Sequence, residues 1–220
     1  MLTPGNRKLG EELIWGFALP SGTSDVCLGM TSTCQAHCYA RRYEQYRQKA
    51  KAKYQRNLEL SKLPDFALRM RYFILNAEIQ VVRIHTGGDF YSPQYAQQWL
   101  QVIESLPTVS FFTYTRCWRV PELRPVLEQM VACPNMQLWY SCDRETGIPS
   151  ELPAGVRTCW LMTEHDDLPP VPVDLVFRIR RLRRLPISSL RVCPDENGKQ
   201  YARPPHCESC GRCWSASRTT

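Results

Sequence analysis

The sequence lacks any apolar run close to the ~20 residues that a helix needs to span a bilayer. It also lacks a secretory signal, because the apolar stretch from Leu13 to Leu19 is short and follows Glu11 and Glu12. These two absences argue against a membrane or secreted protein. We therefore expect a cytoplasmic protein with no membrane partner.

An excess of one charge is also modest, since the net charge is +7 over 220 residues. Such a balance of charges permits association with nucleic acid but does not require it.

With 43% hydrophobic residues, the chain is long enough for one large domain with a real core. We expect an α/β domain over residues 1–190 and a cysteine-rich segment over 191–220 packed on it.

Cysteine is abundant, with eleven residues, an odd number. A core of this size needs no disulfide staples, so in a reducing compartment clustered thiols indicate metal ligands. Seven of them form two sets, Cys27, Cys34 and Cys38 in the loop 27–38, and Cys193, Cys207, Cys210 and Cys213 near the other end of the sequence. The other four are scattered, and we expect them to be small apolar core residues: Cys117, Cys133, Cys142 and Cys159.

The spacing of the cysteines within each set does not decide which metal they bind. Three thiolates from one loop can hold a 4Fe-4S cubane with one free iron, whereas zinc usually takes four ligands. His37 could complete a zinc site, but it is adjacent to Cys38. The second set contains C-x2-C-x2-C, which is typical of ferredoxin-type clusters, with Cys193 as fourth ligand; structural zinc is the alternative, with His206 as a spare ligand. We expect one or two 4Fe-4S clusters, or zinc, and a third arrangement would bring all seven cysteines to one site.

Short apolar segments alternate with segments of helical character along most of the chain. The helical segments lack interior glycine, and one of them begins with a serine cap followed by proline. This alternation predicts a parallel sheet with crossover helices, either open or curled into a partial (β/α) barrel. The expected strands are 12–20, 79–90, 109–115, 136–142, 157–162 and 174–180, and the expected helices are 37–63, 64–78, 92–106 and 120–132.

Polar residues follow several of these expected strands. In sheets of this kind, ligand sites lie at the carboxyl ends of the strands. The cysteine loop follows the first strand, and the residues after the next three strands include Gly87, Gly88, Asp89, Arg116 and Asp143. We expect these residues to share one rim with the first cysteine set.

Four motifs together resemble the phage gene product 88 family, small proteins of phages, plasmids and bacteria. They are C-x6-C-x3-C-Y-A at 27–40, IHTGGDFYS at 84–92, YTRCW at 114–118 and HCESCGRCW at 206–214, so the resemblance spans nearly the whole chain. More distantly, a cysteine loop after the first strand and a Gly-Gly-acid strand end resemble the radical S-adenosylmethionine (SAM) enzymes. Those enzymes are partial (β/α) barrels that bind a three-cysteine cubane, although their usual spacing is C-x3-C-x2-C.

The radical SAM resemblance implies that Gly87, Gly88 and Asp89 match the segment that contacts the amino group of SAM. Arg116 and Asp143 could orient the carboxylate or ribose of SAM, or they could simply pair with each other. We therefore expect an iron-sulfur protein of radical SAM-like architecture from a phage or plasmid. The sequence leaves open whether it is an enzyme; a SAM-dependent radical or redox reaction is the activity that the resemblance implies, and such a reaction would need an electron donor.

The alternative is a zinc- or cluster-stabilised protein of a mobile element that binds nucleic acid. Two basic segments support it. Five arginines lie within Arg178–Leu185, and the expected helix 37–63 mixes basic residues with tyrosines, a composition that suits phosphates and stacked bases. A solvated basic face with its tyrosines packed inward would give the same pattern.

Overall fold

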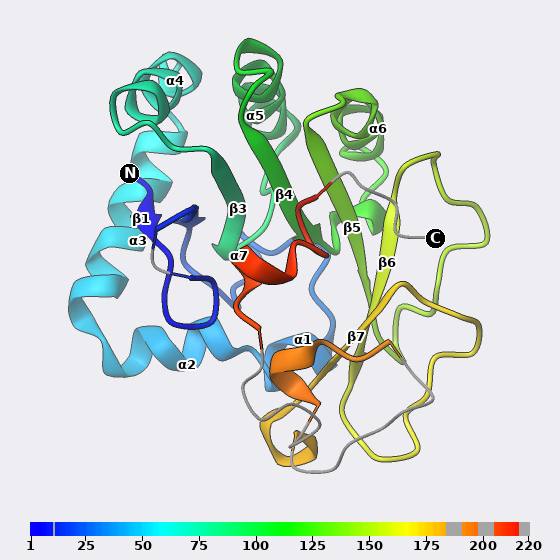
Figure 1. Cartoon of the computed structure of the whole chain (residues 1–220). Coiled ribbons are helices and arrows are strands. Elements are labelled where there is room, and N and C mark those ends of the chain that lie inside the picture. Colours follow the sequence, from blue (N-terminus) through cyan, green and yellow to red (C-terminus); the bar gives the residue numbers. More distant parts are fainter. Residues whose placement is uncertain (11, 184–190, 198–204, 216–220) are drawn as a thin grey trace.

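A seven-stranded sheet lies at the centre of the protein in the computed structural model, which describes residues 1–10, 12–183, 191–197 and 205–215 (Figure 1). The strands lie side by side in the order in which they occur along the chain, with β1 antiparallel to β2 and every later neighbouring pair parallel. The strands are β1 Thr3–Pro4, β2 Ile14–Ala18, β3 Val81–Gly87, β4 Ser110–Thr115, β5 Met136–Cys142, β6 Arg157–Met162 and β7 Leu175–Arg178.

Helices α4, α5 and α6 lie beside one another along the sheet, and α7 lies on its other side (Figure 1). The α-helices are α1 Ser32–Ala36, α2 Tyr39–Tyr46, α3 Gln48–Ser61, α4 Phe66–Asn76, α5 Pro93–Ser105, α6 Arg124–Ala132 and α7 Cys207–Cys210. The described residues also form the short 3-10 helices η1 Cys117–Arg119, η2 Arg180–Leu182 and η3 Pro194–Glu196. Within the described residues, no helix is long and apolar enough to cross a membrane.

Both faces of the sheet are covered, and this explains why its strands are continuous apolar runs. On one face Val82 and Phe111 belong to the main core, which also contains Trp99 of α5. On the other face their neighbours in the strands, Val81 and Phe112, contact residues of the C-terminal cysteine-rich segment. The α/β class and the parallel sheet expected from the sequence are confirmed, and the sheet is open, with β1 and β7 at its edges.

The expected helix over residues 37–63 is wrong in one respect, because the chain forms two helices. The backbone at Arg47, with φ −124° and ψ 81°, ends α2 and begins α3 in a new direction. No glycine or proline marks this break. The change of direction allows Asn57 of α3 to donate a hydrogen bond to the carbonyl of Ala18, 2.9 Å away, at the end of β2.

His85 of β3 is buried, and its Nε2 lies 2.8 Å from the hydroxyl of Tyr95. Burial lowers the pKa of this imidazole to about 3, while the unfolded chain binds a proton near pH ~6.5. A lowered pKa means that the stabilising contribution is present above the unfolded value and is lost as the pH falls. We predict that the free energy of unfolding decreases between about pH 6.5 and pH 4, by up to ~1.4 kcal/mol per unit from this residue.

Urea unfolding at several pH values tests this prediction. His85→Asn should flatten the slope, because asparagine does not titrate in this range and tolerates the left-handed backbone at this position, where φ is 62°. The same slope in both proteins would show that another group controls the pH dependence.

Candidate functional site

The first cysteine set lies at the carboxyl ends of the strands, as expected. Cys27 lies in the loop after β2, Cys34 lies in α1, and Cys38 is the N-cap of α2. Burial, together with the nearby Asp89, Cys34 and Cys38, raises the pKa of Cys27 to about 12. Burial also raises the pKa of Cys34, and the Arg116 guanidinium opposes that rise. The three thiols are therefore partly buried neighbours, and the Arg116 cation lies near Cys34.

Asp143 ties this loop to the sheet. Its Oδ2 accepts a hydrogen bond from the Thr31 hydroxyl at 2.7 Å and one from Arg116 Nε at 3.3 Å. Its Oδ1 accepts from the backbone N–H groups of Glu145 and Thr146, each at 3.0 Å. Thr31 also caps α1 by accepting from the N–H of Cys34 at 2.9 Å. One carboxylate thus connects β5, the residue after β4 and the helix that carries Cys34.

Asp89 and the two glycines before it pack under the same loop. The buried Asp89 carboxylate accepts from the Thr115 hydroxyl at 2.7 Å and from the backbone N–H of Arg116 at 2.9 Å. A Cβ at Gly88 would lie 2.6 Å from Leu19 Cβ, and the φ of this residue is +79°, so only glycine fits there without strain. The Gly87–Asp89 segment is therefore in close contact with the chain that leads to Cys27.

All five residues expected to bind a cofactor are brought to this rim. Each is already engaged within the protein, since Arg116 pairs with Asp143, Asp89 accepts three hydrogen bonds and the glycines contact the loop. Of these contacts, only the pairing of Arg116 with Asp143 is among those considered from the sequence. Contact with SAM remains a prediction.

The second cysteine set lines a small, partly open pocket. Burial raises the pKa of Cys193 to about 12 and that of Cys207 and Cys213 to about 11. Lys8 opposes the rise at Cys193 and Cys207. The residues around the pocket are Leu175, Cys193, Pro194, Asp195, Pro205, Cys207, Cys210, Arg212 and Cys213.

A buried carboxylate holds Cys193 in place. Glu196 accepts from Lys8 Nζ at 3.0 Å, from Arg183 Nη2 at 2.6 Å and from the backbone N–H of Arg178 at 2.7 Å. Burial alone would lower the pKa of Lys8, but the negative charges of Glu196, Cys193 and Asp195 together outweigh it and the pKa is raised. Arg178 and Arg183 of the basic run therefore bind Glu196, and the part of that run beyond Arg183 lies outside the described residues.

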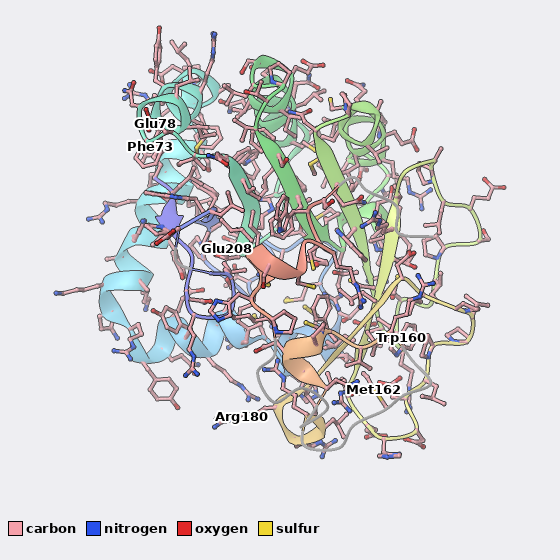
Figure 2. All side chains as sticks on the ribbon, viewed as in Figure 1. Phe73, Glu78, Trp160, Met162, Arg180 and Glu208 are labelled. Carbon is pink, nitrogen blue, oxygen red and sulfur yellow. The ribbon has the colours of Figure 1, made fainter. Side chains whose placement is uncertain are left out.

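Helix α7 is held by the N-terminal part of the chain. The backbone N–H of Cys207 donates to the carbonyl of Lys8 at 2.9 Å. The Glu208 carboxylate accepts from the backbone N–H groups of Glu12 and Leu13 at 3.0 and 2.6 Å, and Figure 2 shows this side chain on α7. Trp139 Nε1 of β5 donates to the carbonyl of Cys213 at 2.9 Å. The segment is thereby fixed over the face of the sheet opposite α4, α5 and α6.

The thiols suit a soft metal or an iron-sulfur cluster, and all eleven cysteines are free. Over the described part of the chain, no three Cys, His, Asp or Glu side chains are arranged to hold a metal ion as they stand. Metal binding therefore requires the thiols around the pocket to turn toward a common point. Within each set, neighbouring thiols raise the pKa of one another.

Sequence reasoning missed the charged residues that hold the second set, namely Lys8, Glu196 and Glu208. Lys8 and Glu208 occur in polar segments, where nothing distinguishes them from surface residues. Arg83 was detectable, because a charged residue inside the apolar run of β3 is unusual. Its Nη2 donates to the Tyr39 hydroxyl at 3.1 Å, and its charge lowers the pKa of Cys207 and Cys213.

Comparison with known proteins agrees with the motif resemblance. The family model described as gene product 88 matches residues 1–216. The chain belongs to the gene product 88 family. The gene 88 protein of Mycobacterium phage D29 is 29% identical over 150 residues, and that of Mycobacterium phage L5 is 30% identical over 152 residues; each match covers 63% of this chain.

The chain spans 60% of the length of these two curated relatives. Neither name states an activity, a cofactor or a partner. No solved structure matches the chain. Membership of the gene product 88 family is therefore shown, and these matches do not extend to radical SAM enzymes.

We predict that Asp143→Ala lowers the free energy of unfolding by about 3–5 kcal/mol, because it leaves the largely buried Arg116 charge and the Thr31 hydroxyl without their partner. It should also release α1, so that Cys34 reacts faster with iodoacetamide. Chemical denaturation and mass spectrometry of the labelled thiols measure both effects. Glu145→Gln is the control, because the exposed Glu145 carboxylate caps the same helix through Ser32 and Thr33 from outside. Unchanged stability in Asp143→Ala would contradict the role assigned to this residue.

Proposed function

We propose that the chain is an iron-sulfur protein with two thiol-lined centres. The observation that carries the proposal is the pocket lined by Cys193, Cys207, Cys210 and Cys213, four reduced thiols that come from two separate segments of the chain. The C-x2-C-x2-C spacing of the last three is typical of cluster ligation. The reducing cytoplasm that we infer for this protein would keep all of these thiols available.

The charges around both sets favour thiolate ligands. Metal binding requires each thiol to lose its proton, and burial opposes that loss in the metal-free protein. Nearby cations stabilise the resulting negative charge. Lys8 and Arg83 do so at the second set, and Arg116 does so at the first.

A finer proposal concerns the first set. Three cysteines at the carboxyl ends of parallel strands would leave one iron of a cubane without a protein ligand, and in radical SAM enzymes such an iron supports reductive cleavage of SAM. In this chain the Gly87–Asp89 segment and Asp143 would hold the cysteine loop rigid. Arg116 would supply a guanidinium for a carboxylate ligand, and an external electron donor would be needed.

Anaerobic purification tests the presence of the clusters. We expect brown protein that contains iron and sulfide, with about half of the iron lost in Cys34→Ala and about half in Cys210→Ala, because each substitution damages one centre. Cys133→Ala is the matched control, since this partly buried thiol belongs to neither set. Loss of all iron in Cys210→Ala would indicate a single shared centre. Colourless protein with stoichiometric zinc would overturn the proposal.

SAM binding is tested on the loaded protein. We expect added SAM to change the spectrum of wild-type protein and of Cys210→Ala, which keeps the first centre, but not that of Cys34→Ala. A spectrum that SAM leaves unchanged in all three proteins would exclude the SAM-dependent function while leaving the iron-sulfur proposal in place.

The second candidate, a zinc-stabilised nucleic-acid-binding protein, is favoured by one specific observation. The tyrosines of α2 lie on the surface rather than in the core. Metal analysis separates the two candidates, because only the zinc protein is colourless.

A further inference from the structure

Helix α2 carries a row of exposed aromatic side chains. Tyr39, Tyr43 and Tyr46 occur at positions i, i+4 and i+7, which places them on one face of the helix. Such a row normally packs against a core. Here the three residues are 63%, 50% and 83% exposed.

Unpaired positive charge surrounds this row. Residues 39–56 contain seven lysines and arginines but one acidic residue, Glu44, which is buried. Arg42 is a helical neighbour of both Tyr39 and Tyr46, three and four positions away. Among the described residues, no salt bridge involves a cation of this segment, whereas Lys62 and Arg69, just beyond it, are both paired.

We propose that the surface formed by α2 and the first half of α3 binds single-stranded nucleic acid. Tyrosine rings stack on bases, and lysine and arginine contact phosphates. A single strand fits better than a duplex, because only unpaired bases offer their faces for stacking. An anionic membrane fits less well, because interfacial helices insert leucine, phenylalanine or tryptophan, and α2 has none of these.

The position of α2 places one end of this surface next to the first cysteine set. Cys38 caps the helix, and the Tyr39 hydroxyl donates to the carbonyl of Thr86 at 2.7 Å, so α2 begins at the carboxyl ends of the strands. A strand bound along the tyrosine row would pass beside the first cysteine set. This inference deepens the second candidate function by naming its binding surface and ligand; the surface itself requires no metal and does not rest on the iron-sulfur proposal.

Fluorescence anisotropy of a labelled thymidine oligonucleotide of about 20 residues with the full-length chain tests the proposal. We expect the combined Tyr43→Ala and Tyr46→Ala variant to bind at least about tenfold more weakly, with little change in salt dependence. The combined Arg47→Gln, Lys49→Gln and Lys51→Gln variant should bind more weakly and lower the slope of log affinity against log salt by about 2.

Two control variants carry matched changes outside the surface. Tyr72→Ala removes an exposed tyrosine of α4, and the combined Lys62→Gln, Arg69→Gln and Arg71→Gln variant removes the same number of charges. Both should bind within about twofold of wild type. Circular dichroism confirms that each variant is folded.

Several results would overturn the proposal. The charge control could weaken binding as much as the surface variant, which would indicate a general effect of net charge. A duplex of the same length could compete as well as the single strand, or the tyrosine variant could bind normally. Tighter binding to phosphatidylserine vesicles than to the oligonucleotide would identify a membrane surface instead. Iron content measured on the same samples shows separately whether the metal centres are present.

Discussion

The Asp143 carboxylate is the constraint on which the first cysteine set depends. It is completely buried, and burial of a charge is costly unless the charge is paired and hydrogen-bonded. Here it accepts from a cation, a hydroxyl and two backbone N–H groups, so the cost is offset. Because these donors belong to the cysteine loop and to the ends of β4 and β5, the loop can occupy only one position on the sheet.

A buried carboxylate also fixes the second cysteine set to the rest of the protein. Glu196 is also buried and also binds cations, in this case Lys8 and Arg183. In each set, a cation that pairs with the anchoring carboxylate also lies close enough to a cysteine to oppose the rise in its pKa that burial causes, Arg116 at Cys34 and Lys8 at Cys193. Attachment of the loops and electrostatic support of the thiols therefore depend on the same side chains.

Most of the sheet could be predicted from the sequence, because strands covered on both faces are uninterrupted apolar runs. The bounds of β5 and β6 agree with the expected ones to the residue. The break at Arg47 could not be predicted, since it depends on packing of α3 against the end of β2 rather than on local residue types.

The candidate site was predictable in place but not in detail. Residues after parallel strands must share one edge, so the position of Asp89 and Asp143 beside the cysteine loop followed from the strand pattern. The sequence did not predict that these carboxylates anchor the cysteine loop, because the hydrogen-bond partner of Asp143, Thr31, lies 112 positions away in the chain. The grouping of the cysteines came from spacing, and spacing alone does not distinguish iron from zinc.

The contacts between α7 and the N-terminal segment also govern how the protein can be made. The backbone carbonyls of Lys8 and Leu9 accept hydrogen bonds from the N–H groups of Cys207 and Glu208, which are synthesised 199 positions later. The contact therefore cannot form until the segment that carries α7 has been made. Until then the apolar face of the sheet that this segment covers stays open to water, so this part of the fold forms late.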